Sequence, residues 1–188
     1  MRIMGKAMSL ETGFDLEREC GEDQLCAGIK GGIEAAIHAV SGLFDCGEGE
    51  AECVLAVDAK NAFNNLSRPA ALWNARQLWP RASRFLFNTY QGHAALCLGG
   101  EKEPLCSQEG TTQGDPMAML MYAAGTLPLV RSLKEPAEQG PQMWFADDSS
   151  KCSSLEQARE WWDKLGEKGC RTAIFPRQAR PSWWCGRG

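Results

Sequence analysis

The chain has 188 residues, enough for one domain with a hydrophobic core and too few for two ordinary domains. Its net charge of −4 does not suggest a general nucleic-acid binder, although residues 58–188 alone carry a net +3 and could face a phosphate backbone. The nine cysteines include no C-x-x-C pair and no secretory signal is evident, so we expect reduced thiols. The longest apolar stretch is too short for a bilayer, so we expect no membrane. We therefore expect an intracellular protein, nuclear or cytoplasmic rather than secreted.

The first half of the chain predicts helices around one buried strand. Residues 1–20 have no clear hydrophobic period and only weak helical character. Residues 31–44 place apolar side chains on one face, which predicts an amphipathic helix. The continuous apolar run 53–57 has the length of a buried central strand, and it ends at a carboxylate, Asp58.

Three further elements follow Asp58. Ser67 precedes Pro69 as an N-cap precedes a first helical turn, so a helix is predicted to run from there to residue 78. A second helix is predicted for residues 81–90. Segments 94–98 and 103–107 flank two glycines and predict a hairpin.

A polar, glycine-rich loop, residues 108–116, leads directly into an apolar helix predicted for residues 117–127. Backbone N–H groups at such a loop and helix start can contact phosphate or sugar groups. An ordinary capped loop is the simpler interpretation when this segment is taken alone.

Two adjacent carboxylates, Asp147 and Asp148, follow the apolar run 143–145. A tight hairpin turn after Phe145 would present at least one of them to solvent at a rigid position. Like charges this close repel each other, and a divalent cation is the simplest remedy. Residues 154–166 then predict a helix that begins with a Ser-x-x-Gln capping box.

The order of these features is the layout of a polymerase palm, and three segments carry a family resemblance. V-D-A-K-N-A-F-N (57–64), Q-E-G-T-T-Q-G-D-P-M (108–117) and F-A-D-D (145–148) resemble motifs A, B and C of reverse transcriptases. The similarity is greatest to the enzymes of non-LTR retrotransposons and related retroelements. Residues 24–39 resemble the segment that precedes motif A in such enzymes, and the resemblance covers residues 24–176.

The resemblance implies an α+β polymerase palm, an antiparallel sheet with helices packed on one face, that performs template-directed DNA synthesis. It implies dNTPs, an RNA template, a DNA primer and two Mg²⁺ ions, with Mn²⁺ as the alternative ion. Two ions held by carboxylates from neighbouring strands suit in-line phosphoryl transfer, and oxygen ligands suit magnesium.

The resemblance also assigns roles to seven residues. Asp58 and Asp147 would be the metal-bridging pair, Asp148 the accessory carboxylate, and Ala59 would offer its backbone carbonyl to a metal. Phe63 would lie under the incoming sugar and exclude a 2′-hydroxyl, which favours a DNA-making enzyme over an RNA replicase. Gln113 and Gly114 would touch the nucleotide and the template strand.

The domain organisation expected from the sequence has three parts. Residues 1–23 are a poorly defined N-terminal segment, 24–176 a palm-like domain and 177–188 a tail that matches no element. Because another reading frame of the tail permits a strand with the lysine expected of motif D, we hypothesise a frameshift or a gene-model error. Fingers and thumb are expected to be largely missing, so we predict at most trace activity for the chain alone.

Two alternatives to a polymerase fragment stay open. One is a catalytically inactive retroelement remnant, at most a nucleic-acid or protein binding module. The other is a different palm enzyme such as a nucleotide cyclase, which would lack the Q-G-D-P loop and the aromatic residue at position 63.

Overall fold

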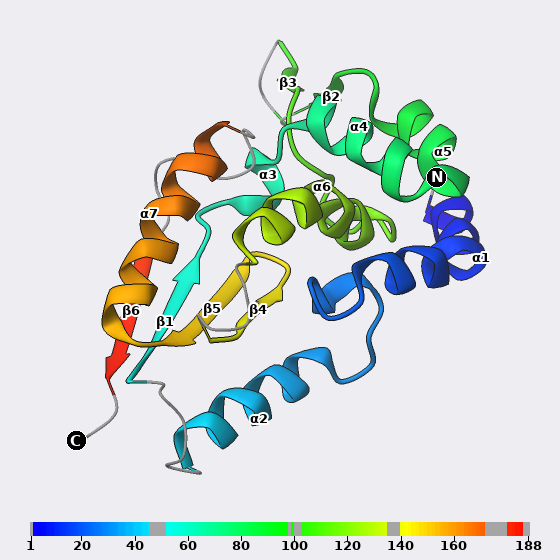
Figure 1. The fold of residues 1–188 in the computed structure, drawn as a ribbon. Coiled ribbons are helices and arrows are strands. Elements are labelled where there is room, and N and C mark those ends of the chain that lie inside the picture. The colour runs from blue at the N-terminus through cyan, green and yellow to red at the C-terminus, as the bar shows by residue number, and fades with distance from the viewer. Residues whose placement is uncertain are drawn as a thin grey trace.

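A four-stranded antiparallel sheet lies at the centre of the fold (Figure 1). The computed structural model describes residues 2–45, 52–97, 99, 103–134, 140–171 and 180–185. In spatial order the strands are β4 (Gln142–Phe145), β5 (Asp148–Ser153), β1 (Cys53–Asp58) and β6 (Arg180–Cys185). Strand β1 has a partner strand on both sides and a helix packed on it, and its apolar side chains are largely buried, as its sequence predicts.

Strand β6 corrects the expectation that residues 177–188 form no element. Its backbone pairs with the whole of β1, from Cys53 opposite Cys185 to Asp58 opposite Arg180. Pro181 is compatible with this strand because β6 lies at the edge of the sheet, where a missing N–H need not interrupt a ladder. The frameshift hypothesis stays a prediction.

The helices that cover the sheet are held by an apolar core. Helix α7 (Leu155–Arg171) packs on β1 and β5, and α6 (Ala118–Leu133) packs against α7. Helix α6 also contacts α4 (Arg68–Leu78), which in turn contacts α5 (Pro80–Tyr90) (Figure 1). The architecture is therefore the predicted α+β arrangement of an antiparallel sheet and packed helices.

Two predicted helix starts are confirmed by their hydrogen bonds. The Ser67 hydroxyl accepts the N–H of Ala70 at 3.4 Å at the start of α4. Ser154 and Gln157 form the reciprocal capping box of α7, with both bonds at 3.3 Å. The predicted hairpin is also present, as β2 (Ala94–Leu96) paired with β3 (Leu105–Ser107).

Helix α6 is longer than its sequence predicts because it continues through Pro128 to Leu133. A proline inside a helix removes one backbone bond and loosens the turn before it. Here the carbonyl that loses its helical donor is that of Ala124, and the Asn74 amide on α4 adds a bond beside it, to the Gly125 carbonyl at 2.9 Å. Burial of nearly the whole helix supplies the rest of the stabilisation.

The N-terminal helices differ from the expectation in their packing. Residues 2–20 form a complete helix, α1 (Arg2–Cys20), where the sequence has only weak helical character. The predicted amphipathic helix is present as α2 (Gly32–Asp45), but its apolar face is not covered: Ile33 is 44% and Ile37 58% exposed. Of the helices that the structure describes, none has the length and apolar character needed to cross a bilayer.

Candidate functional site

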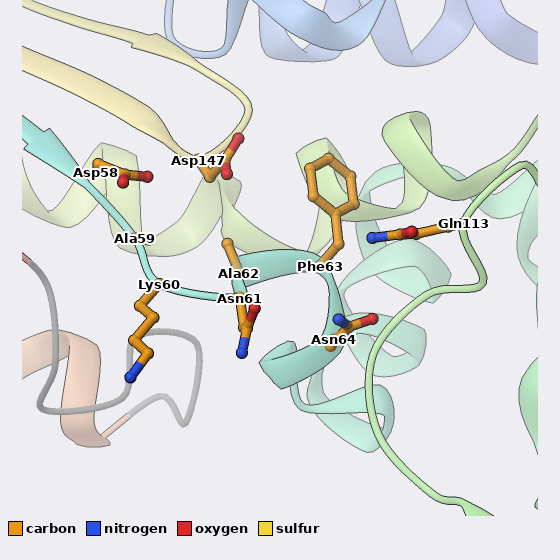
Figure 2. Close-up of a pocket in the computed structure, with 9 residues that line it drawn as sticks. All are labelled: Asp58, Ala59, Lys60, Asn61, Ala62, Phe63, Asn64, Gln113 and Asp147. Atoms are coloured by element: carbon orange, nitrogen blue, oxygen red, sulfur yellow. The ribbon is translucent and has the colours of Figure 1, made fainter.

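A pocket of about 430 Å³ opens where β1 ends and the β4–β5 hairpin turns (Figure 2). Its lining residues are Asp58, Ala59, Lys60, Asn61, Ala62, Phe63, Asn64, Gln113 and Asp147. They come from three segments that are far apart in the sequence: the end of β1 with the turn after it, the loop before α6, and the hairpin. The pocket therefore brings together five of the seven predicted site residues, while Asp148 and Gly114 lie outside its lining.

The β4–β5 hairpin has the tight turn that the sequence predicts after Phe145. Only Ala146 and Asp147 join the two strands, and Ala146 has a positive φ of +54°. This turn carries Asp147 to the pocket wall between Asp58 and Phe63 (Figure 2). Asp148 is the first residue of β5 and lies directly opposite Asp58 in the β1–β5 ladder.

The three carboxylates influence one another electrostatically. Partial burial raises the pKa of Asp148, and the negative charges of Asp147 and Asp58 raise it further. A cation would relieve this repulsion. Within the described part of the chain, however, no three His, Cys, Asp or Glu side chains are grouped closely enough to hold one ion between them.

A magnesium ion at this pocket would use two carboxylates and a backbone oxygen. Asp58 and Asp147 both line it, as does Ala59, whose carbonyl accepts the N–H of Ala62 at 3.2 Å and keeps a second lone pair. Mg²⁺ is commonly held by one or two carboxylates, with water and substrate phosphates completing its coordination. The all-oxygen donor set fits that ion.

A short turn after β1 places the other residues of this wall. Asn61 has a φ of +54°, a left-handed conformation that asparagine adopts more readily than most residues. Its carbonyl accepts the N–H groups of Asn64 and Asn65, both at 3.0 Å, which closes the single-turn helix α3 (Ala62–Asn65). The turn redirects the chain so that Phe63 faces the pocket.

The aromatic ring of Phe63 stacks on the ring of Tyr122 of α6. The ring centroids are 4.5 Å apart at an interplanar angle of 29°. Tyr122 is fully buried, and its hydroxyl has no hydrogen-bond partner among the described residues. Burial and, after it, the charge of Asp147 raise the pKa of Tyr122, which keeps the phenol neutral beside the acids.

The loop that carries Gln113 is anchored by Arg68, a residue for which the sequence suggests no role. Its guanidinium is 5% exposed and donates to the carbonyls of Gly110, Glu109 and Ser107 at 2.8–3.2 Å. It also donates to the Gly92 carbonyl at 2.9 Å. A buried cation with this many acceptors fixes the start of the loop against α4 and the β2–β3 hairpin.

Further contacts fix both ends of the same loop. Gly110 lies directly against the backbone of Phe63 and Asn64, and the Thr111 N–H donates to the Phe63 carbonyl at 2.8 Å. At the other end the Tyr90 hydroxyl donates to Asp115 at 2.5 Å, and Asp115 accepts the Met117 N–H at 2.9 Å. The loop is thus held on both sides of Gln113.

Three residues that support the site have no role assigned by the motifs: Arg68, Tyr122 and Gln24, whose side chain bonds the backbone of Ala146. Arg68 carries one weak signal, since a cation in the first turn of a helix opposes the helix dipole and calls for another explanation. Tyr122 lies in an apolar helix, and Gln24 is a polar residue in a short loop. For neither Tyr122 nor Gln24 does the sequence predict the contact that the residue makes in the fold.

Comparison with solved structures shows what the fold of this chain is similar to. No protein-family model and no curated protein matches the sequence. A structure of apo telomerase from Candida tropicalis, truncated from its C-terminal domain, superposes with a TM-score of 0.66 at 10% sequence identity. The match covers 95% of this chain and 40% of the telomerase chain. Over almost all of its length the chain therefore shares its fold with part of this telomerase.

Proposed function

We propose that this chain is part of a retroelement reverse transcriptase and that its pocket binds a dNTP with magnesium for RNA-templated DNA synthesis. One observation carries the proposal: Asp58, Phe63, Gln113 and Asp147, which motif resemblance assigns to this reaction, line a single pocket. The telomerase-like fold supports the same class of chemistry. The chain spans two-fifths of that telomerase, so template and primer binding are proposed for the whole enzyme rather than for this segment alone.

Each residue of the pocket has a separate task in this proposal. Asp58 and Asp147 would hold the metal, and the Phe63 ring, backed by Tyr122, would exclude a 2′-hydroxyl. Gln113 would contact the nucleotide from the opposite wall. Bound Mg²⁺ would supply the charge that acidifies the primer 3′-hydroxyl and neutralises the departing pyrophosphate. That hydroxyl would give up its proton to solvent water as its oxygen bonds to the α-phosphorus, and the bond from the α-phosphorus to the pyrophosphate would break, with its electron pair leaving on the pyrophosphate.

The test is Mg²⁺-dependent binding of a fluorescent dNTP to the wild type and to Asp147→Asn. We expect the variant to bind about tenfold more weakly or worse, because it loses a charged ligand without a change in shape. EDTA should abolish the difference. Asp163→Asn on α7 is the matched control, since it loses only an exposed ion pair with Arg159 and should bind as the wild type does. Equal, weak binding by wild type and Asp147→Asn would favour a non-catalytic remnant.

A further inference from the structure

The residue before Asp147 holds a backbone conformation that its own side chain disfavours. Ala146 has a φ of +54°, in the left-handed region where the Cβ of an L-residue crowds the following carbonyl. Glycine is the usual choice at such a turn position. A non-glycine residue persists there only when the surrounding structure fixes it.

The side chain of Gln24 bonds both backbone groups of Ala146. The carboxamide oxygen of Gln24 accepts the Ala146 N–H at 2.9 Å, and its nitrogen donates to the Ala146 carbonyl at 3.2 Å. The same nitrogen is 3.4 Å from the Thr126 hydroxyl on α6. Since the Ala146 N–H can only donate, the orientation of the Gln24 amide is determined by this pairing.

Gln24 is completely buried and lies next to the Ala146 turn, which is 122 residues away in the sequence. It immediately precedes the short helix η1 (Leu25–Ala27), which contacts α1, α6 and β4. Ala146 is also buried, at 2% exposure, so no solvent is available to replace a lost partner. One side chain thus satisfies both backbone groups of the residue that precedes Asp147.

We infer that Gln24 is a positioning residue: it holds the Ala146 turn in the left-handed form that presents Asp147 to a divalent cation in the pocket. The part of the inference that concerns the cation rests on the proposed function, whereas the part that concerns the geometry of the turn does not. Gln24 itself does not line the pocket, so it acts only through Ala146. Residues that orient metal ligands in this way usually change metal affinity strongly when they are replaced.

The experiment compares Gln24→Met with Gln142→Met by Mn²⁺ titration, followed by electron paramagnetic resonance, and by amide hydrogen exchange. Methionine keeps the volume of glutamine and removes both hydrogen-bonding groups. Gln142 is the matched control because its amide also makes two bonds, to the Val130 carbonyl and from the Trp161 indole, on the same hairpin but away from the turn. Both variants should lose some stability.

We expect Gln24→Met alone to bind Mn²⁺ about tenfold more weakly and to lose exchange protection at the Ala146 amide. Gln142→Met should bind Mn²⁺ as the wild type does. Equal Mn²⁺ affinity in Gln24→Met and wild type would overturn the inference, as would equal losses in both variants. If wild type and Asp147→Asn bind Mn²⁺ alike, the result contradicts the proposed metal site rather than the role of Gln24. In that case hydrogen exchange of the Ala146 amide still shows whether Gln24 holds the turn.

A measurement on the wild type alone covers the case in which Gln24→Met does not fold. If the held turn is the form that binds the ion, the ion must in return stabilise that turn, because coupling between two equilibria is reciprocal. Saturating Mn²⁺ should therefore slow exchange of the Ala146 amide relative to amides of β1. No such slowing at saturation would contradict the inference.

Discussion

At the scale of single residues, the site combines an aromatic ring on its surface with a buried one beneath it. Phe63 lines the pocket and stacks on Tyr122, whose hydroxyl is buried without a partner among the described residues. A buried hydroxyl without a hydrogen bond loses its hydration and gains nothing in return. The stack, rather than the hydroxyl, is therefore the stabilising part of Tyr122.

Tyr122→Phe tests whether the ring stack, rather than the hydroxyl, is the stabilising part of Tyr122. The variant keeps the ring contact with Phe63 and removes the unsatisfied hydroxyl, so we expect the free energy of unfolding to rise by about 1 kcal/mol or to stay level. Urea denaturation measures it. Tyr122→Leu, which loses the stack, should be clearly less stable than Tyr122→Phe. A loss of stability in Tyr122→Phe would show that the hydroxyl has a partner after all.

Phe63→Ala tests selection of the sugar. Removal of the ring opens the part of the pocket where a 2′-hydroxyl would lie, so the preference for dNTP over rNTP should fall by about tenfold or more. Competition of dATP and ATP for the pocket, in the presence of Mg²⁺, measures the ratio. Phe87→Ala on α5 is a control, because Phe87 is exposed and does not line the pocket. An unchanged ratio in Phe63→Ala would leave Phe63 with only a packing role.

At the scale of elements, features set by neighbouring residues are predicted better from the sequence than features set by contacts between distant segments. The strand before Asp58, both caps and the tight turn after Phe145 follow from neighbouring residues, and all are present. The sequence predicts the end of α6 too early because burial of the helix outweighs the cost of Pro128. Strand β6 was missed because its pairing with β1 joins segments more than a hundred residues apart.

The loop before α6 and the turn after β1 behave as one unit, and Gly110→Ala tests their contact. The φ of Gly110 is +73°, and an added Cβ would lie inside the contact distance of the Phe63 carbonyl and 2.5 Å from Asn64 Cα. Because both neighbours are backbone, neither can rotate away. We expect a loss of about 3 kcal/mol or more in unfolding free energy.

The control for this variant is Gly166→Ala on α7, where no atom lies within 4 Å of the added Cβ. A helical glycine replaced by alanine at such an exposed position should gain about 0.5–1 kcal/mol. Thermal or urea unfolding distinguishes the two directions. Stability of Gly110→Ala close to that of the wild type would show that the loop can separate from α3.

At the scale of the whole molecule, motifs identify the pocket residues but not what holds them. Asp58, Phe63, Gln113 and Asp147 are recognisable because each lies in a short pattern of residue types. Gln24 and Arg68 act through contacts with segments 122 and about 40 residues away, and no local pattern encodes such a contact. Residues that line the pocket can therefore be picked out from the sequence, while the contacts that hold them are a property of the fold.

The distribution of cysteines offers a test of the fold as a whole. None of the six cysteines whose side chains are described forms a disulfide. Burial raises the pKa of Cys20 and Cys26 to about 12 and that of Cys152 to about 11, whereas Cys97 and Cys106 are exposed. Since the thiolate is the reactive form and must be reached by the reagent, iodoacetamide at about pH 8 should modify the two exposed cysteines and spare the four buried ones, which include Cys53. Peptide mass spectrometry follows each site, and guanidinium should make all six described cysteines react. Early modification of Cys26 in native protein would contradict the burial of η1 against the Ala146 turn, because that thiol can react only if this part of the core opens.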